Sequence, residues 1–259
     1  MIFIKKFVLF LIQKINFYFI HKNIVFYHIP RSSGTSIKFY FRKYCGSSSY
    51  CEINQFLTID KTMDKDKSIF LGHMAYNNFF QNQSNVFEFT ILRNPIDRYI
   101  SQYYYFLNFN ATKKVKTNEN IIQKKKLTLI DYVELIKKKQ FDNISTRIFS
   151  NKFNKEGIEE RAFENENSLF KDNYIINEND LEVAINNLKN INVYILETFS
   201  IKRLIKKLNF KIFFDDFHEN KSTRLNSFTE DEIEKIKSIC EFDIMIYKHF
   251  IKSDLSNKY

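Results

Sequence analysis

The 259-residue sequence has no tryptophan, only two prolines and four glycines, and only three cysteines. Cys45, Cys51 and Cys240 show no CxxC spacing and are odd in number, which argues against a zinc site or a disulfide framework. We therefore expect reduced thiols, with a Cys45–Cys51 disulfide left as an open alternative. The GxxxxGK[ST] pattern of a Walker A loop is absent, and so are the signatures of RRM, KH and zinc-finger domains. No partnership with nucleic acid is expected.

Long apolar runs are also lacking. The apolar and basic N-terminal stretch, residues 1–22, is uninterrupted only from Phe7 to Ile12, whereas a membrane-spanning helix needs about 20 apolar residues. No small-residue cleavage site follows it, which argues against a signal peptide. Two interpretations stay open for residues 1–22, an amphipathic helix on a membrane surface and a helix packed on the domain. The expected location is cytoplasmic, with peripheral membrane contact through this segment left open.

The remaining composition is that of a globular domain. Apolar residues make up 44% and charged residues 27% of the chain, and the net charge of +10 favours polyanionic partners. We expect an N-terminal helix over residues 1–22 and a single domain over residues 23–259. A polar, lysine- and asparagine-rich insertion of variable structure is expected around residues 108–190.

The order of hydrophobic patterns predicts the fold class. Short β-branched and aromatic runs at 24–28, 68–71, 85–92 and 192–196 are typical of buried strands, and segments with helical spacing alternate with them. This alternation predicts an α/β fold of P-loop-like type, with a parallel β-sheet flanked by helices. A capping box at Ser227–Glu230 is expected to open one long final helix that ends near Phe250.

The segment after the first strand has the composition of an anion-binding loop. Residues 28–36 read HIPRSSGTS, so a proline ends the strand and a small, polar, glycine-containing turn leads into a helix. Backbone N–H groups at such a helix start bind phosphate or sulfate, and Arg31 adds a positive charge. The candidate ligands of the anion in this loop are Arg31, Ser32, Ser33, Gly34, Thr35 and Ser36.

Two further strands are followed directly by chemically active residues. His73 follows the strand that ends at Gly72, and Arg93 follows the strand that ends at Leu92. Because parallel strands present their carboxyl ends on one edge, His28, His73 and Arg93 should lie together there. A planar arginine fork suits phosphate, and an imidazole suits general base catalysis at neutral pH.

These motifs resemble those of the sulfotransferases that use 3′-phosphoadenosine 5′-phosphosulfate (PAPS). The loop HIPRSSGTS resembles their 5′-phosphosulfate loop, with Arg31 where the family usually has lysine. The segment ILRNPIDRYISQYYYF resembles their 3′-phosphate element, which assigns Arg93 and Ser101 to the 3′-phosphate. The aromatic run in that segment is most similar to the heparan and dermatan sulfate uronyl 2-O-sulfotransferases, in which a Gly-His pair supplies the catalytic base.

The resemblance implies a PAPS-dependent sulfotransferase without a metal, acting on a hydroxyl group of a glycan acceptor. It implies His73 as the base, with His28 as its competitor, and an electrostatic role for Arg31. A third, loosely matched element implies nucleotide contacts from Lys221, Ser222, Thr223 and Arg224, although an exposed basic turn explains these residues as well. A catalytically inactive nucleotide- or acidic-glycan-binding relative and a P-loop-like kinase are the alternatives.

Overall fold

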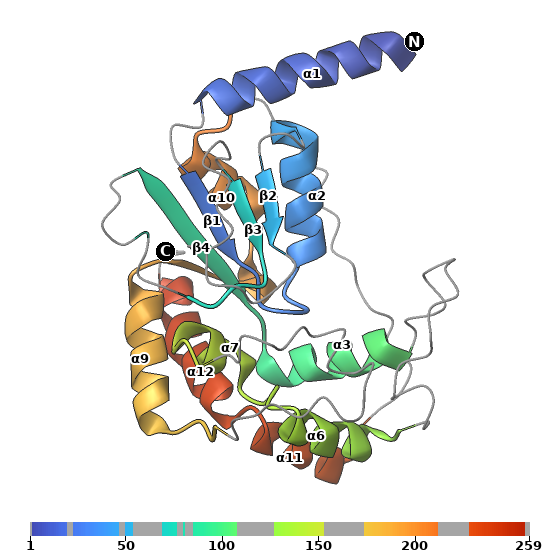
Figure 1. Ribbon diagram of the computed structural model, residues 1–259, viewed down its shortest axis with the longest axis vertical. Helices are drawn as coiled ribbons and strands as arrows, with labels where there is room; N and C mark the ends of the chain where they lie inside the picture. Colours follow the sequence, from blue (N-terminus) through green and yellow to red (C-terminus); the bar gives the residue numbers. More distant parts are fainter. Residues whose placement is uncertain are drawn as a thin grey trace.

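The computed structural model describes residues 2–19, 23–46, 50–53, 69–76, 80, 85–107, 127–152, 174–211 and 228–256. Its centre is a five-stranded sheet in the order β2-β3-β1-β4-β5, and every pair of neighbouring strands is parallel (Figure 1). The strands are β1 (Asn23–Tyr27), β2 (Tyr50–Ile53), β3 (Ile69–Gly72), β4 (Val86–Leu92) and β5 (Asn192–Ile195). The predicted α/β fold, a parallel sheet flanked by helices, is confirmed.

Helices account for most of the remaining described chain. They are α1 (Ile2–Phe19), α2 (Gly34–Cys45), α3 (Pro95–Leu107), α6 (Leu129–Lys138), α7 (Ile144–Phe149), α9 (Glu178–Lys189), the 3₁₀ helix η4 (Leu196–Thr198), α10 (Ile201–Leu208), α11 (Glu230–Ser238) and α12 (Glu241–Ser256). The helix predicted after the loop of residues 28–36 is α2, and helical segments alternate with the strands as the hydrophobic pattern predicted.

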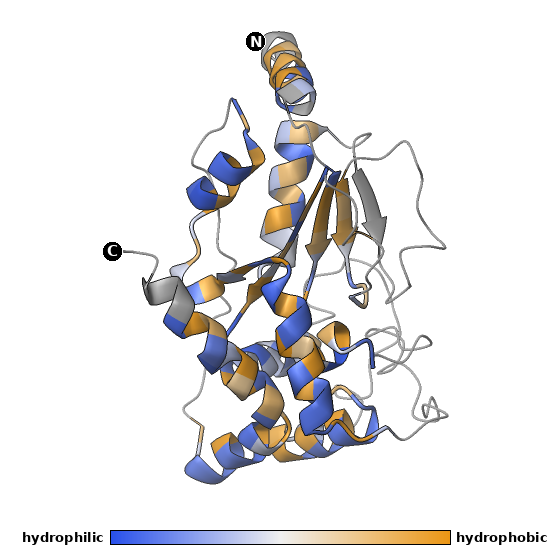
Figure 2. Ribbon diagram, turned by 90° about the vertical axis from the view of Figure 1, so that its left-hand side faces the viewer, coloured by the Kyte–Doolittle hydropathy of each residue, from blue (hydrophilic) through white to orange (hydrophobic). Residues whose placement is uncertain are grey.

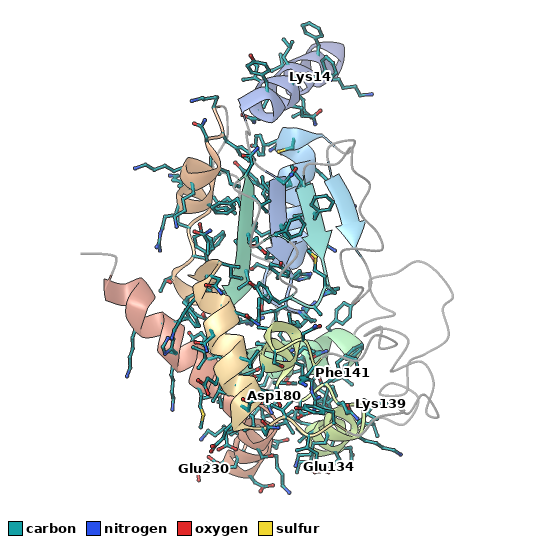
Figure 3. The ribbon with its side chains drawn as sticks, turned by 60° about the vertical axis from the view of Figure 1, so that its left-hand side comes forward. Lys14, Glu134, Lys139, Phe141, Asp180 and Glu230 are labelled. Atoms are coloured by element: carbon teal, nitrogen blue, oxygen red, sulfur yellow. The ribbon has the colours of Figure 1, made fainter. Side chains whose placement is uncertain are left out.

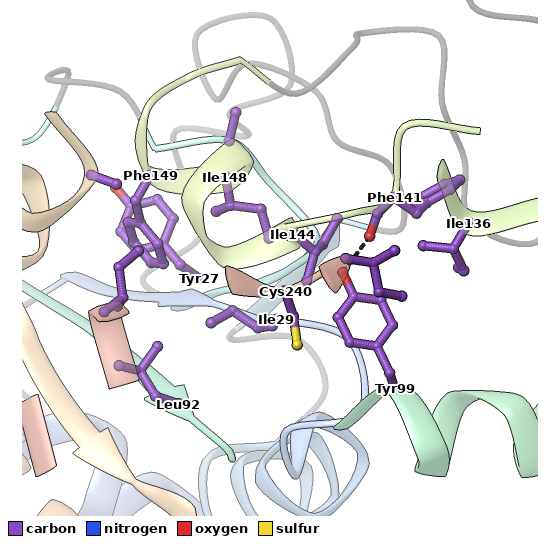
Figure 4. Close-up of a cluster of buried hydrophobic side chains, with 14 of the residues drawn as sticks. Tyr27, Ile29, Leu92, Tyr99, Ile136, Phe141, Ile144, Ile148, Phe149 and Cys240 are labelled. Carbon is purple, nitrogen blue, oxygen red and sulfur yellow. Dashed lines mark hydrogen bonds between the residues drawn. The ribbon is translucent and has the colours of Figure 1, made fainter. Parts of the chain in front are cut away.

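The strand side chains alternate between two hydrophobic cores, as the two-residue period of a strand requires. In β1, Ile24 and Phe26 face a core built with α2 and α10, whereas Val25 and Tyr27 face a second core. Helices α3, α6, α7, α9, α11 and α12 all contribute to this second core, and Figure 1 shows them gathered beyond the carboxyl ends of the strands. Figure 4 shows part of it, where the Tyr99 hydroxyl donates a 2.6 Å hydrogen bond to the carbonyl of Phe141.

The C-terminal helix departs from its prediction in two ways. Its capping box is formed by Thr229 and Glu232, because the Thr229 hydroxyl accepts from the backbone of Glu232 and the Glu232 carboxylate accepts from the backbone of Thr229. The predicted box at Ser227–Glu230 is thus wrong by two residues. The predicted single helix is also wrong, since α11 ends at Ser238 and α12 begins at Glu241.

A reciprocal pair of caps explains this break. The Asn143 side chain accepts from the backbone N–H groups of Phe242 and Asp243, which begin α12. The buried Asp243 carboxylate in turn accepts from the N–H groups of Ser145 and Thr146, which begin α7. Each helix therefore satisfies the first free N–H groups of the other.

One strand was not predicted. Tyr50–Ile53 pairs with β3 as the edge strand β2, outside the four runs that predicted strands. Helix α1 packs across the C-terminal end of α2 (Figure 1). None of the helices in the described ranges is long and apolar enough to cross a membrane. The division into an N-terminal helix over residues 1–22 and a domain over 23–259 stays a prediction.

Candidate active site

Three neighbouring strands deliver the candidate residues to one edge of the sheet. Tyr27, the last residue of β1, aligns with Gly72 of β3 and with Thr90 of β4. The residues that follow these strands, His28, His73 and Arg93, therefore share the carboxyl edge, as the order of strands and motifs predicted. The backbone N–H of His28 continues the pairing by donating to the carbonyl of Gly72 at 2.9 Å.

The loop between β1 and α2 turns sharply through two left-handed residues. Arg31 and Ser33 have φ angles of 64° and 61°, a region that costs a non-glycine residue free energy. Ser33 is the N-cap residue of α2, yet its side chain makes no capping hydrogen bond to the helix. The first turn of α2 consequently keeps the backbone donors and the positive end of the helix dipole that favour an anion.

Hydroxyl groups surround this helix start. Ser32 is fully buried, and its Oγ has no hydrogen-bond partner among the residues that the structure describes. A buried hydroxyl without a partner costs free energy, so a ligand oxygen at this position would be stabilising. Thr35 is exposed, and Ser33 and Ser36 are half-buried.

Gly34 is required by the side chain of His28. A Cβ atom at position 34 would lie 1.9 Å from Nε2, 2.0 Å from Cε1 and 2.3 Å from Cδ2 of that imidazole. Real Cβ atoms essentially never approach other atoms so closely, so the ring of His28 occupies the space that any other residue at 34 would need. The glycine therefore allows the His28 ring to pack against the start of α2.

The two histidines at this edge are stacked. Their ring centroids lie 4.3 Å apart at an interplanar angle of 27°, and Nδ1 of His73 lies 2.9 Å from the backbone oxygen of His28. A carbonyl oxygen can only accept, so Nδ1 of His73 carries the proton. In the neutral imidazole the acceptor lone pair is then on Nε2.

The two rings differ in their surroundings. His28 is buried, and burial lowers the pKa of its imidazole well below 6.5, with smaller contributions from His73, Lys38 and Arg31. At neutral pH His28 is therefore uncharged. His73 is only half-buried, so it has more contact with solvent than His28.

The two arginines link the loop to α3. Nη1 of Arg93 donates to the carbonyl of Arg31 at 3.0 Å, and Nε and Nη2 of Arg31 each donate to Oγ of Ser101 at 3.3 Å. The Arg31 guanidinium also lies 4.6 Å from the ring centroid of Tyr105, a cation–π contact. The residues that the sequence assigned to two separate phosphate sites are therefore in direct contact in this structure.

The start of α3 is fixed by residues from several elements. Oδ1 of Asn94 accepts from the N–H groups of Ile96 at 3.0 Å and Asp97 at 3.4 Å, so Asn94 is the N-cap of α3. The N–H of Asn94 donates to Oε1 of Glu197, whose Oε2 accepts from the Tyr247 hydroxyl. Glu197, Tyr247 and Tyr105 were not predicted as site residues from the sequence. Glu197 lies two residues after the end of β5, so its position at a strand end was a signal that could have identified it.

The rest of the predicted site lies elsewhere in the chain. Lys221, Ser222, Thr223 and Arg224 lie outside the described residues. Within the described ranges, no group of three or more His, Cys, Asp and Glu side chains is placed to hold a metal ion.

Comparison with known proteins bears on the chemistry of this edge. No individual curated protein matches the chain. Residues 17–257 match the model of the sulfotransferase family, a range that includes all five strands, both histidines and both arginines of the site. This chain therefore belongs to the sulfotransferase family.

Proposed function

We propose that this protein transfers a sulfuryl group from PAPS to a hydroxyl group of a glycan, with His73 as the general base. The observation that carries the proposal is the hydrogen bond from Nδ1 of His73 to the carbonyl of His28. It places the acceptor lone pair of His73 on Nε2, the nitrogen that would take the proton of the acceptor hydroxyl. His28 is a poorer candidate, because it is buried with its ring against Gly34.

The residues of the loop and of α3 fit the two ends of the donor. PAPS, when bound, would supply a sulfuryl group joined to a phosphate that can leave. The start of α2 offers backbone N–H groups, and the buried Ser32 hydroxyl lacks a partner within the described ranges, so both suit the oxygens of the phosphosulfate. Arg93 and Ser101 are proposed to bind the 3′-phosphate, and Lys221–Arg224 to add contacts from the C-terminal part.

Arg31 is proposed to act through its charge alone. An arginine side chain stays protonated at all relevant pH values, so it cannot pass a proton to the leaving phosphate. It can neutralise the negative charge that develops there, which is the largest contribution a protein makes to many group transfers. Its present contacts with Ser101 and Tyr105 hold the guanidinium at the same edge as His73.

The acceptor is proposed to be a glycan, and an acidic polysaccharide is favoured. The net charge of +10 suits a polyanion, and the aromatic run after Ser101 resembles the uronyl 2-O-sulfotransferases.

The test is transfer of radiolabelled sulfate from PAPS to a panel of neutral and acidic polysaccharides, with nucleotide binding measured separately. We expect transfer to at least one polysaccharide. His73→Ala should lower turnover roughly 10²–10⁴-fold, the usual contribution of a general base, while nucleotide affinity stays unchanged. His249→Ala, at an exposed position on α12, is the matched control and should keep normal turnover.

Two results would contradict the assignment. Normal turnover in His73→Ala together with its loss in a folded His28→Ala would move the base to His28. Nucleotide binding without transfer to any acceptor would favour the inactive, ligand-binding relative.

A further inference from the structure

Helix α1 presents its apolar side to solvent. Phe7, Leu11 and Ile15 recur at every fourth position, so they lie along one face of the helix, with Val8 and Phe10 beside them. The exposed fractions are 55% for Phe7, 51% for Phe10, 47% for Val8, 43% for Leu11 and 36% for Ile15. Figure 2 shows the orange, hydrophobic residues of α1 at the outer end of the molecule.

The opposite face of α1 attaches the helix to the domain through the buried side chain of Ile12, which joins the core built with α2, and through polar groups. The Gln13 amide donates to the carbonyl of Lys43 at 3.1 Å, and the buried Asn16 amide donates to the carbonyl of Tyr44 at 3.3 Å. Oδ1 of Asn16 accepts from the N–H of Lys211 at 3.1 Å. These bonds satisfy carbonyl groups at the C-terminal end of α2, so the attachment of α1 does not require its apolar outer face.

The charge around this face is of one sign. No Asp or Glu occurs before Glu52, whereas this part of the chain contains Lys5, Lys6, Lys14, Lys22, Arg31, Lys38, Arg42 and Lys43. Lys6 and Lys14 are exposed on α1 itself, and Arg42 is exposed on α2 next to the attachment point. Lys14, labelled in Figure 3, lies 5.6 Å from the centroid of the Phe10 ring, so it can extend past apolar groups with its charge outward.

We infer that the outer face of α1 docks on an anionic lipid bilayer, lying in the plane of its surface. An apolar helix face that carries Lys14, has Lys6 at its edge and is free of acidic residues is the pattern that buries in the headgroup region and attracts anionic lipids. The geometry is compatible with catalysis at the carboxyl edge. Because α2 starts at the site and ends at the attached side of α1, roughly 18 Å, the length of a 12-residue helix, separates the loop from that side, and the outer face of α1 lies farther away still.

The orientation follows from the same arrangement. The carboxyl ends of the strands point away from α1 (Figure 1), so a docked molecule holds its candidate active site toward the aqueous phase. This inference does not depend on the proposed function.

The test is co-sedimentation of the full chain with vesicles of phosphatidylcholine alone or mixed with phosphatidylglycerol. We expect binding to the phosphatidylglycerol vesicles, weaker binding to the neutral ones, and loss of binding as salt is raised. The double variant Phe7→Ser/Leu11→Ser should bind at least about tenfold more weakly, and Lys6→Gln/Lys14→Gln should lose the preference for phosphatidylglycerol. The control Ile175→Ser/Met245→Ser removes exposed apolar side chains away from α1 and should bind like the unmodified protein.

Three outcomes would overturn the inference. In the first, the unmodified protein stays in the supernatant with both kinds of vesicle. In the second, the control variant loses as much binding as Phe7→Ser/Leu11→Ser does. In the third, the unmodified protein binds no vesicles but self-associates, and Phe7→Ser/Leu11→Ser abolishes that self-association. The last outcome would assign the face to a second copy of the chain. Thermal unfolding of each variant checks that these exposed substitutions leave the fold intact.

Discussion

The Gly34→Ala variant sets two opposite effects against each other. Glycine is a poor helix former, so alanine in α2 would by propensity alone stabilise the fold by up to about 1 kcal/mol. The new Cβ, however, would lie 1.9 Å from Nε2 of His28, a ring that is buried and stacked 4.3 Å from His73 and 5.5 Å from Phe26. The balance of the two effects decides the sign of the change.

The steric effect should prevail. Overpacking a well-packed interior costs typically about 1–3 kcal/mol, because rings and backbone must shift. Since 1 kcal/mol corresponds to roughly 2–4 °C for a domain of 150–250 residues, the melting temperature should fall by several degrees. Urea denaturation gives the free energy of unfolding directly, and Thr35→Ala, an exposed position in the same helical turn, should change it by less than about 0.5 kcal/mol.

A double-mutant cycle isolates the contact. In a His28→Ala background the ring is absent, so Gly34→Ala should no longer destabilise the protein, and the coupling between the two positions should exceed about 1 kcal/mol. A Gly34→Ala protein as stable as the unmodified one, or a coupling near zero, would refute the packing of His28 against Gly34.

Two further predictions concern the buried polar groups. Because burial holds the pKa of His28 below 6.5, the unfolded chain takes up a proton that the folded protein does not. The free energy of unfolding should therefore fall as the pH drops below about 6.5. Urea titrations across this range should show a smaller fall for His28→Gln than for the unmodified protein. The same fall in both proteins would contradict the lowered pKa of His28. Asp243→Ala leaves the N–H groups of Ser145 and Thr146 without their acceptor and should cost about 1–3 kcal/mol by denaturation. Asp243→Asn, which keeps an acceptor, should cost less, and equal losses in the two variants would argue against the capping role.

The central fold was predictable because its signals are local. The strands β1, β3, β4 and β5 are short β-branched and aromatic runs, and the strand-end argument correctly brought His28, His73 and Arg93 to one edge. The edge strand Tyr50–Ile53 gave a weaker signal, because its sequence YCEI stands between polar neighbours, three serines before it and Asn54 and Gln55 after it. Pairing with β3 creates that strand, and pairing partners cannot be read from local pattern.

Contacts between distant residues explain the other differences. The break between α11 and α12 depends on Asn143, which lies about one hundred residues earlier and caps α12. The need for glycine at position 34 depends on the ring of His28, and the contact of Arg31 with Ser101 depends on how α3 leaves β4. Periodicity and composition predict elements and their order, whereas side-chain contacts of this kind require the packed structure.

The most direct test of the central claim is calorimetry of nucleotide binding at this edge. With EDTA present, 3′-phosphoadenosine 5′-phosphate should bind more tightly than adenosine 5′-phosphate, because only the former offers a 3′-phosphate to Arg93 and Ser101. Arg93→Ala should weaken binding of 3′-phosphoadenosine 5′-phosphate by about 1.5–3 kcal/mol, the contribution of a hydrogen bond to a charged group, and should weaken binding of adenosine 5′-phosphate by less, because there the substitution removes the bond to the Arg31 carbonyl but no contact with a 3′-phosphate. Equal affinity for the two nucleotides, an unchanged affinity in a folded Arg93→Ala variant, or binding only with Mg²⁺ would contradict the account.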